Sequence, residues 1–212
     1  AEQAEQMMSE REKSGVAFGR EHESLANLFY NISDYKDTRQ KAFDHYCKAY
    51  LSGQQSALYD LGWLYFINGY SNDFFKLSSD ELIQEIISSE KNSESSNLAY
   101  LLGYIYFNGY KVQENKTEAE QWYMKAIDKG SLSAPCRLAL YYINERKLYD
   151  KGFSVLEKAY EKGSVEATRL LGLCYKNGIG VKKNRSKAKA LLREAEKKGD
   201  EDAAAELKKF IF

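Results

Sequence analysis

Proline is almost absent from this sequence, where Pro135 stands alone among 212 residues. A proline inside a helix removes a hydrogen bond and clashes with the preceding turn, so its scarcity leaves long helices uninterrupted. Cysteine is scarce as well, and the three cysteines, Cys47, Cys136 and Cys174, are too few and too far apart to form a disulfide framework. Each lies among apolar neighbours in a helical pattern, and we expect all three to be small core residues.

Net charge is also missing, because 31 basic and 31 acidic residues give a formal charge of +0. This balance argues against a protein that works by bulk attraction to nucleic acid or to an anionic membrane. No apolar run approaches the ~18 residues of a transmembrane segment. The chain begins Ala1-Glu2-Gln3, without an initiator Met or a signal peptide. We therefore expect a soluble protein, either cytoplasmic or periplasmic and exported after removal of a leader.

Groups suited to catalysis or metal binding are few. The two histidines, His22 and His45, have no Cys or His partner at metal-ligand spacing. His22 lies near an acidic helix start, and we expect it at the surface. The segment Gly178-Ile179-Gly180 lacks the preceding strand that a dinucleotide-binding loop requires. We find no arrangement of Ser, His and Asp or of Cys and His. The sequence therefore predicts no catalytic residues, no metal site, no cofactor and no enzymatic activity.

What the chain does contain is a repeated pattern: a leucine, a small residue directly after it, and an aromatic residue three positions further on. The pattern begins at Leu25, Leu61, Leu102, Leu138 and Leu171, and Leu207 begins a truncated sixth copy. Subtraction of these residue numbers gives spacings of 36, 41, 36, 33 and 36. A near-constant period of this length is typical of a helix–turn–helix solenoid, in which each pair of helices buries its apolar face against neighbouring pairs.

Helix-ending and helix-starting residues recur with the same period. Glycines that suit helix C-termini follow the second helix of four copies, at Gly53, Gly130, Gly163 and Gly199. Three of them are followed by a possible N-cap for the next helix, at Ser131, Ser164 and Asp200. Two second helices begin with residues typical of a capping box, Ser78 with Glu81 and Asn115 with Glu118. These signals divide the chain into pairs of helices.

The repeat resembles the Sel-one-like repeat family, a relative of the tetratricopeptide repeats. The last full copy matches the family pattern at Ala167, Leu171-Gly172, Tyr175, Gly178, Gly180-Val181, Lys187-Ala188, Ala195 and Gly199. The copy from Leu98 matches it at Leu102-Gly103, Tyr106, Gly109, Val112, Ala119, Trp122-Tyr123, Lys125-Ala126 and Gly130. The resemblance implies an all-α, right-handed superhelical solenoid of about five repeats with terminal caps. His45 takes the place of the family's tryptophan, so we expect a packing role for it.

The repeat also predicts how the chain divides. Residues 1–20 are expected to form a polar N-terminal helix or tail, and residues 203–212 a capping helix in which Leu207, Phe210 and Phe212 cover the last repeat. The expected copies lie near 21–56, 57–97, 98–133, 134–166 and 167–202. The second copy carries an insertion over residues 71–96 with a polar end, and the fourth lacks the family's Gly-x-Gly-Val loop.

A second face of the first helices is left free by the repeat. Residues two before, two after and five after each leucine point away from the structural face. In the resembling tetratricopeptide architecture, such positions line the concave surface. In the second and third copies all six are aromatic: Tyr59, Trp63, Phe66, Tyr100, Tyr104 and Phe107. Glu23 precedes this strip and Arg169 follows it. We predict a partner-binding surface formed by these aromatic residues and Arg169.

An alternative is that the aromatic strip is core, covered by the insertion or by tight curvature. Phe66 and Phe107 lie near turns, and we expect them to pack locally. The basic run from Lys182 to Lys198 has two similar interpretations: a patch for an anionic partner, or the solvated outer face of the last helix pair.

The resemblance favours a protein–protein interaction module that binds another protein or a peptide. Bacterial members of the family serve as adaptors, as secreted or periplasmic interaction factors, and as immunity proteins that neutralise toxins. Two other functions stay open. Aromatic side chains also stack on sugars, which would suit a peptidoglycan or glycan binder. A weak cell-wall or β-lactam hydrolase would need a nucleophile or base in the groove, and Cys136 with Glu23 or Arg169 is a poor set.

Overall fold

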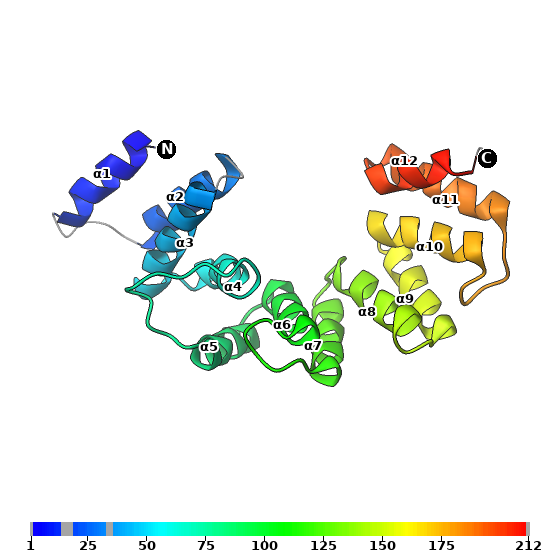
Figure 1. The fold of residues 1–212 in the computed structure, drawn as a ribbon, viewed down its shortest axis with the longest axis horizontal. Coiled ribbons are helices and arrows are strands. Elements are labelled where there is room, and N and C mark those ends of the chain that lie inside the picture. Colours follow the sequence, from blue (N-terminus) through cyan, green and yellow to red (C-terminus); the bar gives the residue numbers. More distant parts are fainter. Residues whose placement is uncertain (1, 14–18, 33–35, 211–212) are drawn as a thin grey trace. The chain divides into compact units, whose positions relative to one another are not determined.

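The computed structural model describes residues 2–13, 19–32 and 36–210, and within these ranges the chain is helical, without a β-strand (Figure 1). From α1 (Glu2–Lys13) to α6 (Asn97–Asn108), and again from α8 (Ala134–Asn144) to α12 (Glu201–Lys208), successive helices pack against one another in sequence order, as the repeat predicts. The chain divides into two compact units, residues 1–119 and residues 120–212, which we describe separately.

The first unit contains three first helices and the second helices that accompany them. Its elements are α1 (Glu2–Lys13), α2 (Gly19–Ile32), α3 (Lys36–Leu51), a 3₁₀ turn η1 (Gln55–Ala57), α4 (Leu58–Gly62), a π-helix η2 (Trp63–Ile67), α5 (Ser79–Lys91), α6 (Asn97–Asn108) and the start of α7 (Lys116–Asp128). Helix α2 packs on α3, α3 on α4, and α4 on both α5 and α6. Helix α5 also packs on α6, so the α4–η2 segment is surrounded by neighbours.

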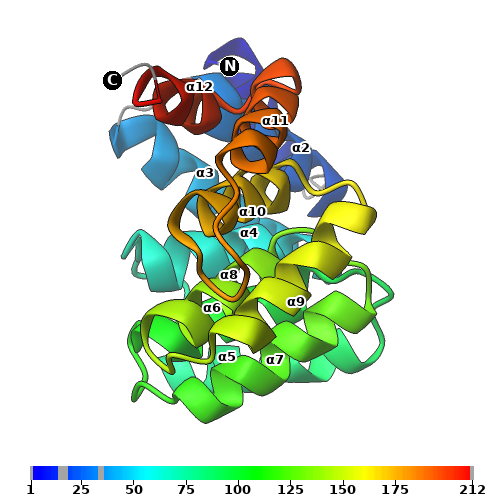
Figure 2. The same cartoon turned by 90° about the vertical axis from the view of Figure 1, so that its right-hand side faces the viewer.

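The second unit continues the order from the end of α7. It contains α8 (Ala134–Asn144), α9 (Tyr149–Glu161), α10 (Val165–Asn177), α11 (Arg185–Lys197) and α12 (Glu201–Lys208). From α8 to α12 each helix packs on the next one in sequence. Figures 1 and 2 show these five helices following one another from yellow-green to red.

The repeated leucines form the core, as predicted. Leu25, Leu61, Leu102, Leu138 and Leu171 are at most 4% exposed. The small residue after each leucine is buried as well. The aromatic position is buried in Phe29, Tyr142 and Tyr175 and half-buried in Tyr65 and Tyr106. Full burial of one leucine stabilises a fold by roughly 1.5–3 kcal/mol, so the stripe contributes to the stability of every copy.

The predicted helix ends are confirmed with one exception. Gly53, Gly130, Gly163 and Gly199 have φ values of 89°, 86°, 87° and 91°, in the left-handed region where a glycine is favoured. Ser164 and Asp200 are the N-caps of α10 and α12, and their side chains accept the N–H groups of Ala167 and Ala203. Ser131, predicted as an N-cap, is not one: its hydroxyl accepts the N–H of Ala134, but the N-cap of α8 is Ser133. Ser78 and Glu81 form a complete capping box, and Asn115 and Glu118 bond reciprocally. The cysteines are buried and free, as expected.

The prediction for His22 is wrong. Its side chain is 4% exposed, and its Nδ1 atom lies 3.0 Å from Nδ1 of His45, which is 6% exposed. The two rings stack with centroids 5.3 Å apart, and His45 has the expected packing role. His22 precedes Leu25 and Ala26 by three and four residues, so it extends the buried stripe of α2 by one turn. This helical spacing, rather than the acidic neighbours, determines its position.

The segment at 71–96, expected as an insertion, contains α5. The apolar residues Leu82, Ile83 and Ile86 are at most 3% exposed, and they pack this helix into the first unit. At the other end of the chain, Leu207 and Phe210 pack against Leu192, Ala195 and Ala203. Phe212, expected beside them, lies outside the described residues.

Gly172 tests the close packing of the helix pairs. A Cβ atom added there would lie 2.9 Å from Cγ of Leu192 and 3.3 Å from the carbonyl oxygen of Ala188. Because α10 and α11 cannot separate without loss of core contacts, Gly172→Leu is expected to lower the free energy of unfolding by roughly 1–3 kcal/mol. Urea denaturation followed by circular dichroism measures this change.

The matched control is Ala190→Leu, which adds a similar side chain to the exposed face of α11. This control should change stability by no more than about 0.5 kcal/mol. Equal urea midpoints for the two variants would contradict the proposed close approach.

Candidate functional site

Five aromatic rings of the first unit form one continuous set, which we call the aromatic ladder: Tyr59, Trp63, Tyr100, Tyr104 and Tyr110. The rings of Tyr59 and Trp63 have centroids 6.2 Å apart. Trp63 stacks on Tyr104 at 5.3 Å with an interplanar angle of 23°. Tyr104 also stacks on Tyr110 at 5.9 Å and on Tyr100 at 6.3 Å. The five side chains are half-buried, so the ladder keeps part of its surface accessible to solvent.

The sequence explains why these rings meet. Tyr59 and Trp63, like Tyr100 and Tyr104, are separated by four residues and so lie on the same face of a helical segment. The two segments approach closely at Gly62, where an added Cβ atom would lie 2.8 Å from a methyl carbon of Leu101. The absent side chain at Gly62 therefore lets rings from α4–η2 stack on rings from α6.

The π-helix begins at Trp63 and changes the direction of the residues after it. The N–H groups of Asn68 and Tyr70 donate to the carbonyl oxygens of Trp63 and Leu64, five and six residues earlier. A wider turn rotates the chain less per residue, which places Phe66 on the core side, where it is 2% exposed. The predicted surface residue Phe66 thus presents almost no surface and packs edge-on against Tyr65.

Phe107, the other residue near a turn, is half-buried and carries a cation from the same chain on its ring. The Lys116 ammonium lies 3.6 Å from the centroid of its ring. Both phenylalanines therefore pack locally, whereas the tyrosines and the tryptophan of the strip form the ladder.

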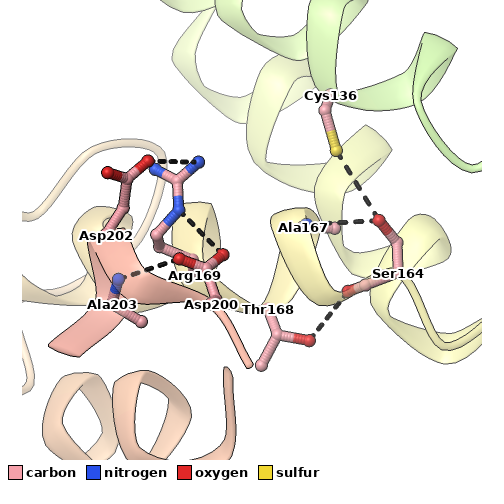
Figure 3. A network of polar contacts seen from close by, with 8 residues as sticks. All are labelled: Cys136, Ser164, Ala167, Thr168, Arg169, Asp200, Asp202 and Ala203. Carbon is pink, nitrogen blue, oxygen red and sulfur yellow. Dashed lines mark hydrogen bonds and ion pairs between the residues drawn. The ribbon is translucent and has the colours of Figure 1, made fainter. Parts of the chain in front are cut away.

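Arg169 lies in the second unit and is held by carboxylates. Its Nε atom lies 3.0 Å from Oδ2 of Asp200, and an Nη atom lies 3.6 Å from Oδ2 of Asp202. Figure 3 shows the guanidinium directed toward these two residues at the start of α12. Nearby, the Ser164 hydroxyl accepts the N–H of Ala167 and lies 3.8 Å from the Cys136 sulfur (Figure 3). In this arrangement, Arg169 connects α10 to the N-cap of α12.

Carboxylates adjoin the Tyr59 end of the ladder. Asp60 is half-buried, and among the described residues no hydrogen bond or ion pair reaches its carboxylate. Burial, and secondarily the Glu23 carboxylate, raise the pKa of Asp60 to about 6. Burial, together with Asp60, also raises the pKa of Tyr59 to about 12. Glu23 itself accepts a hydrogen bond of 2.9 Å from the Ser56 hydroxyl.

A pocket of about 690 Å³ opens beside the same end of the ladder. Tyr59, Leu98 and Glu85 contribute to its wall. The remaining lining residues carry hydroxyl or amide groups: Gln55, Ser56, Ser88, Ser89, Asn92, Ser93, Ser95 and Asn97. Such groups both donate and accept hydrogen bonds, so the pocket could bind a peptide backbone or the hydroxyls of a sugar.

The described residues contain no group of three or more His, Cys, Asp or Glu side chains that could hold a metal ion. Nor is any of the described helices both long enough and apolar enough to span a membrane. The groups that the candidate site offers to a ligand are aromatic rings, carboxylates, hydroxyls and amides.

The repeat family is established by sequence. The Sel1 repeat model matches residues 25–54, 55–69, 97–131 and 165–200, which together make up more than half of the chain. The protein belongs to the Sel1 repeat family, whose repeats mediate protein–protein interactions. Residues 132–164 lie outside the matched stretches, and there α8 and α9 form a pair of their own.

Known proteins show the same fold. A Sel1 repeat protein from Oxalobacter formigenes has a TM-score of 0.67 at 23% identity, with 89% of this chain and 74% of that chain covered. Immunity protein Pa5087 from Pseudomonas aeruginosa has a TM-score of 0.57 at 21% identity, with 89% and 70% covered. Chitin synthase regulatory factor 1 of Schizosaccharomyces pombe is 27% identical over 155 residues, which are 70% of this chain and 33% of that relative. The matched region thus spans about a third of this curated relative.

Two parts of the candidate site were not foreseen. Tyr110 lies outside the periodic positions, although the recurrence of tyrosine beyond the helix end was a usable signal. Asp60 directly follows Tyr59, and nothing in the spacing marks it as half-buried. Its position becomes visible only when α2 and α4 are placed together.

Asp60 should make stability depend on pH. Because its pKa in the folded state is raised from an ordinary value of 3.8 to about 6, the folded protein keeps a proton that the unfolded chain releases. Ionisation of Asp60 therefore destabilises the fold. The free energy of unfolding that the protonated carboxyl group contributes falls as pH rises from about 4 to about 6. Asp60→Asn should be more stable than wild type at pH 7.5, by on the order of 1 kcal/mol after solvent screening is considered.

Chemical denaturation at pH 7.5 and at pH 4 tests this effect, with the exposed Asp73→Asn as control. The difference between Asp60→Asn and wild type should shrink toward zero at pH 4. A difference that does not change with pH would contradict the assigned environment of Asp60.

The Arg169 contacts predict a graded effect on α12. Asp200→Ala removes both the N-cap and the ion pair and should lower the local stability of α12 by roughly 1–2 kcal/mol. Asp200→Asn keeps a cap acceptor and should cost less. Asp202→Ala changes a side chain that is 78% exposed and should have almost no effect. Amide hydrogen exchange of α12 measures all three, and equal protection in the three variants would contradict the role assigned to Asp200.

Proposed function

We propose that the first unit binds a segment of a partner protein on the aromatic ladder, and that the protein acts as a non-enzymatic adaptor or as a toxin-neutralising immunity protein. The observation that carries this proposal is the continuous stack of half-buried rings from two neighbouring first helices. Tyrosine and tryptophan bury a large area with few rotatable bonds, and both are enriched where partner proteins bind most strongly.

Other features of the molecule support a binding role. Sel1 repeats are protein-interaction modules, and the solved relatives include an immunity protein. A π-helix at Trp63 is also consistent, because π-helical turns are frequent at functional sites. The exposed part of the ladder, the half-buried carboxylate and the pocket all lie in the first unit. This concentration of accessible aromatic and polar groups favours the first unit over the Arg169 region as the partner site.

The cysteines support a non-enzymatic role. Burial raises the pKa of Cys47 and Cys136 to about 12 and that of Cys174 to about 11. Thiols with such values remain protonated near neutral pH, whereas a cysteine nucleophile requires the thiolate. The set of Cys136 with Arg169 therefore lacks an activated nucleophile, which argues against the hydrolase alternative.

A glycan binder is the second candidate, and the pocket beside Tyr59 is the observation that favours it. Hydroxyl and amide groups line most of its wall, and an aromatic ring adjoins them. Peptidoglycan fragments would fit this chemistry. Saturable binding of such fragments, lost in Tyr59→Ala, would favour a glycan over a protein partner.

The aromatic ladder can be tested by affinity capture from the native organism. Replacement of Tyr100 and Tyr104 together by alanine removes two rings that contact Trp63 or one another, while leaving the repeated leucines intact. We expect at least about tenfold weaker capture of a specific protein, with unchanged helicity by circular dichroism.

Tyr149→Ala is the matched control, because Tyr149 is a 43% exposed tyrosine of the second unit outside the ladder. It should retain the partner. Undiminished capture by the double variant would show that the partner binds elsewhere. Loss of cooperative unfolding in the double variant would show that these rings serve as core.

A further inference from the structure

We infer that the partner segment carries an arginine or lysine side chain, which binds at the Tyr59 end of the aromatic ladder, beside the carboxylates of Asp60 and Glu23. This inference deepens the proposed function and depends on it. It concerns the chemistry of the occupant, whereas the proposed function concerns only the surface used.

The first observation is an uncompensated negative charge beside aromatic rings. Asp60 from α4 and Glu23 from α2 are close enough for the Glu23 charge to disfavour ionisation of Asp60. A third carboxylate, Glu85 from α5, lines the adjoining pocket. A half-buried carboxylate next to a like charge is unfavourable unless a cation approaches it. A cationic side chain from a partner would supply that compensation.

The surrounding elements supply acidic or phenolic groups to this end of the ladder. Burial, and secondarily the charge of the Asp60 carboxylate, raise the pKa of Tyr46 of α3 and of Tyr59 of α4. Tyr100 of α6 and Tyr30 of α2 influence Tyr59 in the same direction. The grouping of these oxygen atoms from four helical elements favours a positively charged occupant.

Three cations of the first unit lie over aromatic rings outside the ladder. The Arg39 guanidinium lies 4.3 Å from the centroid of Tyr30, and the Lys41 ammonium lies 5.3 Å from that of Phe29. The Lys111 ammonium lies 3.6 Å from the centroid of Tyr65. These contacts show that rings on this unit accept cations on their faces. Tyr30 already carries Arg39 and Tyr46 is only 1% exposed, which leaves Tyr59 as the accessible ring beside Asp60.

The pocket provides the remaining contacts for an extended peptide. Its hydroxyl and amide groups can bond to peptide N–H and C=O groups. Tyr59 lines the pocket, and the centroid of its ring lies 6.2 Å from that of Trp63. The Ser56 hydroxyl, which lines the pocket, also donates to Glu23. A peptide backbone in the pocket could therefore direct one cationic side chain over Tyr59 toward the two carboxylates.

The first test uses short peptides and the fluorescence of Trp63. Trp122→Phe removes the second tryptophan, so the remaining signal comes from the ladder. The probes are three acetylated eight-residue Gly/Ser peptides with two arginines, two citrullines or two glutamates. Citrulline has nearly the shape of arginine but no charge. At pH 7.5 the arginine peptide should bind saturably and on the order of tenfold more tightly than the citrulline peptide, with no binding of the glutamate peptide.

Charge-removing variants and pH provide the controls. The double variant Asp60→Asn, Glu23→Gln should reduce binding of the arginine peptide to the level of the citrulline peptide. Lowering the pH from 7.5 to 5 should weaken the wild-type interaction with arginine several-fold and leave the citrulline peptide unaffected. Equal affinities for arginine and citrulline, or no saturable arginine binding at millimolar concentration, would overturn the inference.

Capture of the native partner separates this inference from the proposed function. If the Tyr100/Tyr104 double alanine loses the partner and the Asp60/Glu23 double variant retains it undiminished, the cationic occupant is contradicted and the aromatic surface stands. If both variants retain the partner, the proposed function fails as well. Saturable binding of peptidoglycan fragments in place of the peptides would contradict a cationic protein segment.

Discussion

Close contact between neighbouring helices at small residues is the constraint on which the rest of this structure depends. At Gly62 and Gly172 there is no room for a side chain, because leucines of the adjacent helices occupy that space. The repeated leucines can then be buried from both sides, and each helix pair is stabilised by the next. Since this stripe satisfies the packing of the first helices, their remaining face can be used for other contacts.

In the first unit that remaining face holds aromatic rings and carboxylates. The close approach at Gly62 brings Trp63 and Tyr104 into a stack, so the aromatic ladder is a direct consequence of core packing. Burial raises the pKa of Asp60 to about 6. At neutral pH the carboxyl group is nevertheless mostly ionised, and a half-buried charge lowers the stability of the fold. Such a residue is consistent with a trade between stability and binding, which is common at functional sites. In the last repeat of the second unit, the position equivalent to Tyr59 holds Arg169, whose charge is compensated by Asp200.

The periodic features of the sequence predicted the fold well, because helical spacing, glycine ends and N-caps are local properties. Leu171-Gly172 and Ser164 could be assigned from their neighbours in sequence alone. The sequence pattern did not predict side-chain positions that depend on contacts between helices or on an irregular helical turn. The π-helix rotates Phe66 into the core, and the pairing of α2 with α3 buries His22 against His45. The partners of Arg169 and the environment of Asp60 depend on which helices lie side by side. The ladder residues Tyr59, Trp63, Tyr100 and Tyr104 were found because they follow the repeat.

The central claim is that the aromatic ladder contacts the partner, and site-specific photocrosslinking in the native organism tests it most directly. A photoreactive benzoyl-phenylalanine at position 104 would sit in the ladder, and the same residue at position 149 would sit on an exposed tyrosine site of the second unit. The account predicts a discrete crosslinked protein from position 104 and none from position 149. A crosslink from position 149 alone, with none from position 104, would contradict it.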